Sequence, residues 1–235
     1  MASVYLIRHG QASFGDDDYD KLSSLGEVQA RLVGESLRAK MARPSRILTG
    51  TMLRHQQTAQ QALAAFAQDD VDLPEPVSQA CWNEYAHQEI LGAYDTRFAT
   101  AAGIKAHLQH SSHPEKTFLN LFNAAVARWM SGEHDTDYSE TWLQFTARLQ
   151  SGIQSVIADL QAKENVLIFT SGGPISYLAQ SYLGVPKENL MQMNWTLVNT
   201  GITKLIRSRQ GVFVASLNEH SIFEKPENQH CISYK

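Results

Sequence analysis

The stretch VYLIRHGQASFG, residues 4–15, begins as an apolar strand and stops abruptly at Arg8-His9-Gly10. A short, near-continuous apolar run of this kind is typical of a strand that is covered on both faces of a sheet. In doubly wound sheets, ligands bind beyond the carboxyl ends of such strands. The stretch therefore predicts a buried first strand and a binding site at its end.

The rest of the chain alternates strands with amphipathic helices. Apolar runs at 45–50 and 165–170 predict two more buried strands, and the runs separated by glycine over 201–220 predict a terminal hairpin. Helices are predicted between these strands, the first one with a buried stripe. That stripe consists of Leu25, Val28, Leu32 and Met41. The pattern predicts an α/β fold, a three-layer sandwich with a mostly parallel central sheet flanked by helices.

Between about residues 85 and 137 the pattern changes to helices alone. Residues 117–130 gather their apolar side chains on one helix face, which needs a surface to pack against. A second long helix follows, with Asp137 and Glu140 spaced as a capping box at its start. We expect a single domain, residues 1–235, with a helical insertion at about 85–137 lying over the site.

Composition limits the class of partner and the compartment. A chain of 235 residues, 43% of them hydrophobic, can bury one sizeable core. A formal net charge of −4 with scattered basic residues predicts no nucleic-acid partner. The sequence shows neither a signal peptide nor a long apolar run, so no membrane association is expected. Only two cysteines occur, Cys81 and Cys231, far apart in the chain, and this predicts a cytoplasmic protein.

Three of the predicted strands end in groups suited to an anion. Arg8 follows the first strand, Arg54 lies one turn past the second, and the third runs into Ser171-Gly172 at a helix start. An arginine guanidinium can bind two oxygens of one phosphoryl group at once, and the N–H groups at a helix start favour a negatively charged ligand. His9 would then attack phosphorus through a neutral ring nitrogen, with a carbonyl holding the other nitrogen, and form a phosphohistidine.

A run of three histidines raises the question of a metal site. His107, His110 and His113 are spaced by three, which could align two imidazoles on one helix face for zinc. Pro114 ends any helix at that point, and a polar, solvated loop explains the composition equally well. No metal site is therefore expected.

Six motifs carry a resemblance to a known family. They are YLIRHGQA (5–12), LSSLGEVQA (22–30), LTGTMLRHQQTA (48–59), NEY (83–85), SETWLQFTAR (139–148) and VLIFTSGGPIS (166–176). On these motifs the chain resembles the histidine phosphatase superfamily, also called phosphoglycerate mutase-like proteins. The resemblance implies that His9 is the phosphorylated nucleophile, that Arg8 and Arg54 clamp the phosphate, and that Glu84 donates a proton to the leaving alcohol. It implies no metal and no cofactor.

The sequence departs from the family pattern at two positions. Members carry a histidine before the Gly-Gly of the last motif, where this chain has Ser171. A serine keeps one donor without positive charge, and losing an oriented donor costs on the order of 10²–10³ in rate. Many members also have an asparagine at the position of Gly15. His55 and His87 are close to the implied site in sequence, but a residue next to Arg54 on a helix points about 100° away from it, so neither is expected to compensate.

Two functions stay open from the sequence. The first is a phosphatase that hydrolyses a small phosphomonoester through a phosphohistidine on His9, with activity reduced by Ser171. The second is a catalytically weak module that binds a phosphorylated ligand or a phosphoprotein. In both cases the expected partner is a small phosphorylated molecule or inorganic phosphate. A mutase is less favoured, because the full set of phosphoglycerate-contacting residues is not found.

Overall fold

The computed structural model describes residues 1–13, 20–66 and 72–234, so Gly15 and the acidic run 16–18 lie outside the described residues. Contacts divide the chain into two compact units. One, here called the sheet unit, comprises Met1–Glu84 and Ser151–Lys235, and the other, the helical unit, comprises Tyr85–Gln150. The predicted insertion falls within the helical unit, and its position over the site stays a prediction.

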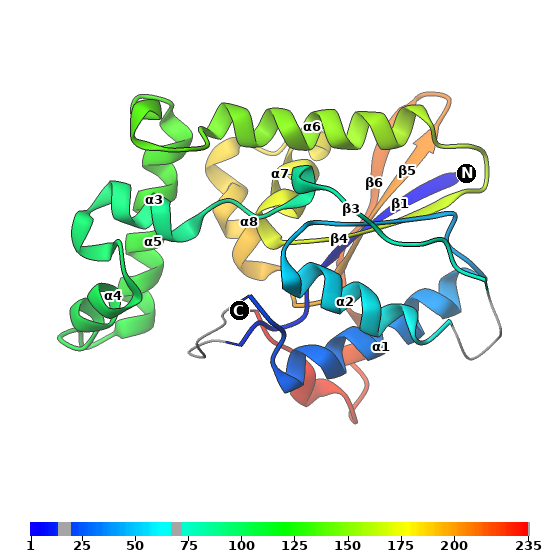
Figure 1. Ribbon diagram of the computed structural model, residues 1–235, viewed down its shortest axis with the longest axis horizontal. Coiled ribbons are helices and arrows are strands. Elements are labelled where there is room, and N and C mark those ends of the chain that lie inside the picture. Colours follow the sequence, from blue (N-terminus) through cyan, green and yellow to red (C-terminus); the bar gives the residue numbers. More distant parts are fainter. Residues whose placement is uncertain (14–19, 67–71, 235) are drawn as a thin grey trace. The chain divides into compact units, whose positions relative to one another are not determined.

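Among the described residues, six strands form one sheet in the order β3-β2-β4-β1-β5-β6 (Figure 1). The strands are β1 (Ala2–Arg8), β2 (Arg46–Thr49), β3 (Val77–Ser78), β4 (Asn165–Thr170), β5 (Ile202–Ser208) and β6 (Gly211–Glu219). β3, β2, β4 and β1 pair in parallel, whereas β5 joins β1 and β6 joins β5 in antiparallel fashion. The predicted α/β fold with a mostly parallel sheet and a terminal hairpin is confirmed.

Helices cover the sheet and make up the helical unit. In the sheet unit these are α1 (Ser24–Lys40), α2 (Leu53–Leu63), α7 (Gly172–Leu183) and α8 (Leu190–Thr196). In the helical unit they are α3 (His87–Tyr94), α4 (Ala101–Leu108) and α5 (Pro114–Ser131), and α6 (Trp142–Ala158) continues from it into the sheet unit. Within the described residues, none of the helices combines the length and the apolarity that a bilayer crossing requires.

Alternating side chains of the central strands build the core. Tyr5 and Ile7 of β1, together with Phe169 of β4, belong to one buried cluster with the apolar faces of α1 and α2. Leu6 lies between Tyr5 and Ile7, and Ile168 directly precedes Phe169. Both are buried as well, so by the period of two they face the other side of the sheet. Both faces are therefore covered, which explains why β1 and β4 read as continuous apolar runs.

The strand register brings the predicted site residues to one edge of the sheet. Arg8 at the end of β1 is paired with Thr170 at the end of β4. β2 ends beside them, because Thr49 is paired with Phe169 and the following Gly50 donates its N–H to the Phe169 carbonyl at 3.0 Å. The segments that follow these three strands therefore start from neighbouring points.

The stripe predicted for α1 is only one of its two buried faces. Leu25, Val28 and Leu32 are half-buried and pack against a small cluster near the C-terminus. The fully buried face is a different one, formed by Ala30, Val33 and Leu37. The helix lies between two apolar surfaces, so a single stripe with a period of 3.6 describes it incompletely.

The capping box predicted at Asp137 and Glu140 is wrong. Thr141 Oγ1 accepts a hydrogen bond from the Gln144 N–H at 3.2 Å, and Gln144 Oε1 accepts one from the Thr141 N–H at 2.8 Å. This reciprocal pair is itself a capping box, and it lies at the start of α6. Glu140 instead accepts a hydrogen bond from Arg148 Nε at 2.6 Å. The pair Asp137 and Glu140 has the same spacing of three residues as the true pair, so spacing alone did not distinguish them.

Candidate active site

His9 directly follows β1 and is fixed on its backbone and its ring. Its N–H donates to the Thr170 carbonyl at 2.9 Å, and its carbonyl accepts a hydrogen bond from Asn199 Nδ2 at 3.1 Å. The ring nitrogen Nδ1 lies 2.7 Å from the carbonyl oxygen of Gly10. Because a carbonyl only accepts, the proton is on Nδ1 and the lone pair is on Nε2. The imidazole thus presents one nucleophilic nitrogen.

The surroundings of His9 keep its imidazole neutral. Burial holds the pKa of His9 well below 6.5, and the charges of Arg54 and Arg8 and the nearby His55 lower it further. At neutral pH the ring is therefore uncharged, with a proton on Nδ1 and none on Nε2, as a nucleophile requires. Both arginines lie close enough to act on His9 electrostatically.

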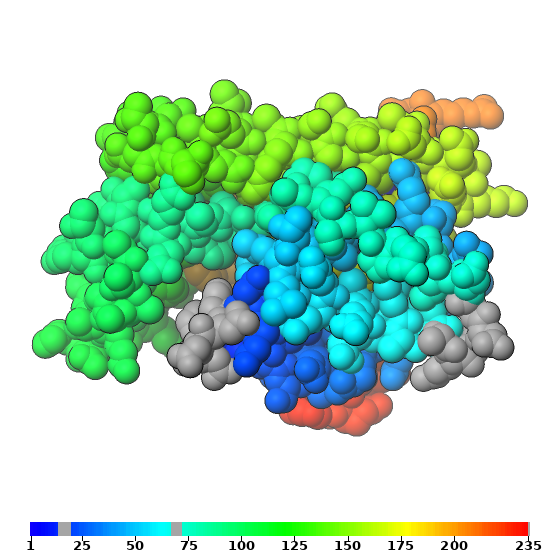
Figure 2. Space-filling view, in the orientation of Figure 1, coloured from blue at the N-terminus to red at the C-terminus, as the bar shows by residue number. Residues whose placement is uncertain are grey.

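The segment after β1 packs tightly against α1 and α2. A β-carbon at Gly10 would lie 2.4 Å from the Gly26 carbonyl oxygen, so only glycine fits at this position. The Gly10 N–H donates to Thr58 Oγ1 at 3.0 Å, which links the segment to α2. Figure 2 shows the two segments against each other, dark blue and cyan. The glycine after His9 is thus required by packing within the protein.

Arg54 is buried at the start of α2 and holds a carboxylate that the sequence analysis did not single out. Its Nη1 donates to Asp20 Oδ1 at 2.5 Å. The second oxygen of Asp20, Oδ2, accepts the Leu53 N–H at 2.8 Å, and an anion at a helix start is stabilised by the helix dipole. Arg54 therefore already binds an anionic group.

Arg8 is held by the C-terminal part of the sheet unit. Its Nη1 donates to the Leu197 carbonyl, and its Nη2 donates to the Tyr234 carbonyl at 3.2 Å. A β-carbon at Gly172 would lie 3.7 Å from Arg8 Nε, so the guanidinium also borders the start of α7. The role of Arg8 as half of a phosphate clamp stays a prediction.

His55 lies inside the site, contrary to the expectation that it would point away. Its side chain is fully buried, its ring centroid is 5.7 Å from that of His9, and its Nε2 is 2.6 Å from Ser171 Oγ. The residue is carried by the first turn of α2, whose N-terminal end starts at the sheet edge. At such an end, side chains 100° apart on the helix can both reach the site. Burial, followed by the charge of Arg54, holds the pKa of His55 well below 6.5.

The Glu84 side chain reaches the first turn of α7. Its side chain is buried, and Oε2 accepts the Gly173 N–H at 3.0 Å. The segment that precedes it is anchored to β4, because Thr170 Oγ1 donates to the Trp82 carbonyl at 2.5 Å. The structure therefore brings this carboxyl group, which sequence placed only by resemblance, to the edge of the sheet that carries His9.

Gly172 packs closely against a side chain of α8. A β-carbon there would lie 2.6 Å from Asn194 Oδ1. Ser176, one turn further along α7, donates to the Gly172 carbonyl at 2.7 Å and contacts the same Asn194 oxygen at 3.2 Å. Phosphate binding by Gly172 stays a prediction.

The three histidines of the 107–113 run are used separately in the helical unit. The His107 ring packs against Phe98 with centroids 5.1 Å apart, and His110 Nδ1 lies 2.9 Å from the Ala106 carbonyl. His113 is the N-cap residue of α5, which begins at Pro114. Within the described residues, no group of three or more histidine, cysteine or acidic side chains is arranged to hold a metal.

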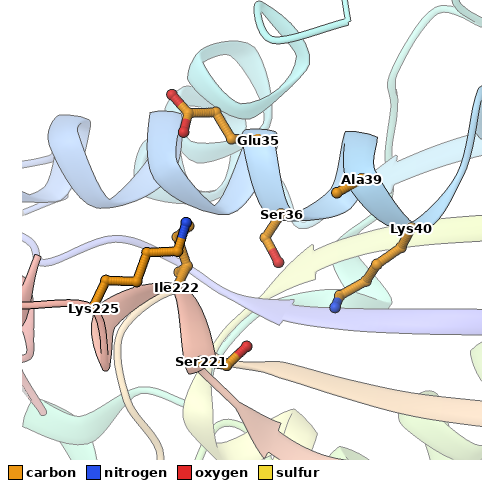
Figure 3. A pocket seen from close by; sticks show the side chains of 7 residues that line it. All are labelled: Glu35, Ser36, Ala39, Lys40, Ser221, Ile222 and Lys225. Carbon is orange, nitrogen blue, oxygen red and sulfur yellow. The ribbon is translucent and has the colours of Figure 1, made fainter.

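Figure 3 shows a groove of about 250 Å³ in a different part of the sheet unit. Residues of α1, among them Lys40, and residues near the C-terminus, among them Ser221 and Lys225, line it. Lys40 is engaged by Glu219 at 2.6 Å. The groove contains none of the predicted site residues, so the sheet edge with His9 is the better candidate for chemistry.

Comparisons with known proteins identify the family and the fold. The sequence model of the histidine phosphatase superfamily (branch 1) matches residues 4–106 and 109–220. A comparison with curated proteins found no match. Among solved structures, phosphoglycerate mutase from Bacillus anthracis str. Sterne is 18% identical with a TM-score of 0.61, and covers 96% of each chain.

Two further solved structures are phosphatases. A phosphoserine phosphatase mutant from Entamoeba histolytica in complex with phosphoserine is 17% identical with a TM-score of 0.60, covering 93% of this chain and 98% of the other. A mycobacterial glucosyl-3-phosphoglycerate phosphatase with VO3 is 19% identical with a TM-score of 0.62, covering 94% and 100%. At these identities the structures show a shared fold. The family model matches most of the chain, and this match shows that the chain belongs to the histidine phosphatase superfamily.

Proposed function

We propose that the protein is a phosphatase that hydrolyses a small phosphomonoester through a phosphohistidine on His9. The observation that carries the proposal is the His9 imidazole itself, which is neutral, has Nδ1 fixed on the Gly10 carbonyl, and is buried near two arginines. An imidazole held in this way has a lone pair on Nε2 and nearby positive charge for the phosphoryl oxygens. The proposal is supported by solved relatives whose names record bound phosphoserine in one case and bound inorganic phosphate in another.

In the first step, His9 Nε2 forms a bond to phosphorus while the bond to the leaving alcohol oxygen breaks. Glu84 transfers its proton to that oxygen, so the alcohol leaves neutral and Glu84 becomes a carboxylate. Arg8 and Arg54 stabilise the negative charge on the non-bridging oxygens. The position of Glu84 beside the start of α7 supports its role as this acid.

In the second step, water attacks the phosphohistidine. Glu84 takes a proton from the water, the P–N bond breaks, and its electron pair returns to Nε2 of His9. Nδ1 keeps its proton throughout and donates it in a hydrogen bond to the Gly10 carbonyl, so the same nitrogen, Nε2, is available for the next turnover. Inorganic phosphate is the second product, and the cycle needs no metal and no cofactor.

A binding module is the second candidate, and the contacts of the arginines favour it. Arg54 is engaged by Asp20 and Arg8 by two carbonyl groups, so anion binding must compete with groups of the protein itself. Such a protein would bind a phosphorylated ligand or phosphoprotein and turn it over weakly. We propose a cytoplasmic location for either function, supported by the presence of only two cysteines, Cys81 and Cys231, which are far apart in the sequence.

Phosphate release from a panel of small phosphomonoesters tests the proposal. The wild-type protein is compared with His9→Ala and with His110→Ala, an exposed histidine of the helical unit that serves as the control. We expect loss of turnover in His9→Ala alone, and an acid-labile, base-stable phosphoadduct on the wild-type protein. Undiminished turnover in His9→Ala would rule out the mechanism. Phosphate binding without turnover or adduct would favour the binding module.

A further inference from the structure

We infer that His55 positions the Ser171 hydroxyl, so that this hydroxyl donates a hydrogen bond to a phosphoryl oxygen bound beside His9. The relay of two side chains would supply the oriented donor that the family pattern places on a single histidine at position 171. The inference rests on the proposed function, because it requires a phosphoryl group at His9. It makes His55 a positioning residue that acts through Ser171.

The contact between the two side chains is short and enclosed. His55 Nε2 lies 2.6 Å from Ser171 Oγ, and both residues are fully buried. The pair adjoins the nucleophile, because the His55 and His9 ring centroids are 5.7 Å apart and Ser171 follows Thr170, whose carbonyl binds the His9 N–H. Hydrogen bonds shielded from water in this way are stronger than exposed ones and polarise one another.

Packing at Gly50 decides which ring nitrogen of His55 carries the proton. His55 Nδ1 is buried and has no hydrogen-bond partner among the described residues. A β-carbon at Gly50 would lie 2.1 Å from this nitrogen, so the Gly50 backbone closes that side of the ring. An orphaned buried N–H is costlier than an unused acceptor, so the proton belongs on Nε2. Nε2 therefore donates to Ser171 Oγ.

Ser171 is thereby left as a donor toward the site. A serine at an N-cap position usually accepts a hydrogen bond from an N–H of the first helical turn. Ser171 makes no such capping bond, and the Gly173 N–H is taken by Glu84 at 3.0 Å instead. With its oxygen accepting from His55, the hydroxyl hydrogen has to point to another acceptor. A phosphoryl oxygen on His9 is the acceptor that the proposed chemistry provides.

Nitrogen NMR of the imidazoles tests the relay without any need for turnover. Long-range proton–nitrogen correlation distinguishes the two neutral tautomers, and the His55 signals are assigned by their loss in His55→Gln. We expect the Nε2–H form for His55 and the Nδ1–H form for His9. An Nδ1–H form of His55 would overturn the inference, because the serine hydroxyl would then have to donate to His55.

Vanadate binding and kinetics test the consequence for the phosphoryl group. His55→Leu and Ser171→Ala should each lower kcat by about 10²-fold with KM nearly unchanged, and the double variant should lose no more than either single one. His55→Gln keeps an N–H donor on the side chain and should recover much of the loss. If the kcat losses of His55→Leu and Ser171→Ala add up in the double variant, or if His55→Gln recovers no activity, then His55 has only a structural role and the inference is wrong. Vanadate affinity should follow the same pattern, so the relay is tested even if the wild type releases no phosphate and the proposed function fails.

Moving the imidazole provides a second, independent test. A histidine introduced at position 171 alone would collide with the His55 ring, so Ser171→His should lower activity and vanadate affinity. Combining it with His55→Ala makes room for the new ring, and this double variant should bind vanadate better than Ser171→His by about tenfold or more. Equal affinity in the two variants would mean that His55 and position 171 do not share one function.

Discussion

Asp20 Oδ1 lies 2.5 Å from Arg54 Nη1, so the guanidinium expected to bind phosphate already binds a carboxylate of the same chain. Arg54 is nearly fully buried, while Asp20 is partly exposed and also accepts the Leu53 N–H. The carboxylate thus occupies an N–H group of Arg54 that the proposed phosphate would use, and its negative charge would repel that phosphate. If Arg54 binds phosphate as proposed, we expect this contact to lower the affinity of the site for anions.

Asp20→Asn should therefore bind inorganic phosphate more tightly. The amide keeps an oxygen for the Leu53 N–H but lacks the negative charge, and we expect the dissociation constant to fall by about threefold to tenfold at low salt. Calorimetric titration measures it. Asp95→Asn is the matched control, since Asp95 pairs with Arg97 at 2.6 Å in the helical unit. Weaker binding in Asp20→Asn would show that the carboxylate orients Arg54 instead of competing with the ligand.

Glu84→Gln should impair the chemical step and leave the fold intact. Glutamine is nearly isosteric and keeps a carbonyl oxygen for the Gly173 N–H, but it has no proton to give. We expect kcat to fall by about 10²–10⁴-fold for alkyl phosphates, whose leaving alcohols need protonation. The fall should be much smaller for an aryl phosphate with an acidic leaving group. An equal loss for both substrates would contradict the acid role.

The strands and the residues that follow them were predictable from sequence, whereas the orientation of the helix starts was not. Val4 to Ile7 and the 165–170 run are apolar on both faces, and that local property identifies buried strands. His55 was misplaced because the angle between neighbouring residues on a helix says nothing about where the helix axis points. Asp20 was missed because its partner, Arg54, is distant in sequence and only the folded chain brings them together.

Stability should decrease as the pH falls below about 6.5, and two buried imidazoles should account for part of the decrease. The pKa values of His9 and His55 are held well below 6.5 by burial and nearby arginines. Above pH 6.5 neither the folded nor the unfolded chain protonates them, so no stability is lost. Below it the unfolded chain takes up protons first, and each imidazole lowers the free energy of unfolding by ~1.4 kcal/mol per pH unit until its folded pKa is reached.

Urea unfolding between pH 7 and 5 measures this dependence. His55→Gln should remove one imidazole's share of the slope, and His9→Gln should remove a similar share. His110→Gln should leave the slope unchanged, because that side chain is exposed in the folded protein as well. A wild-type slope that neither buried substitution reduces would mean that these rings are protonated in the folded protein.

Gly50→Ala should destabilise the protein through His55. Gly50 is not among the glycines with positive φ, so alanine suits its backbone, but the new β-carbon would lie 2.1 Å from His55 Nδ1 and 2.8 Å from Asn83 Oδ1. Overpacking of this kind costs about 1–3 kcal/mol. In a His55→Ala background the ring is gone, so the same substitution should cost clearly less.

The double-mutant cycle of Gly50→Ala and His55→Ala separates the destabilisation caused by the His55 ring from that caused by other packing in the β2–α2 turn. Urea denaturation of the four proteins gives the coupling free energy, and residues in contact are expected to show at least about 0.5 kcal/mol. The Asn83 contact is present in both backgrounds and cancels in the cycle. In Gly50→Ala the displaced ring should also release Ser171, so kcat should fall together with stability. Additive free energies with unchanged kcat would show that Gly50 does not hold the ring against Ser171.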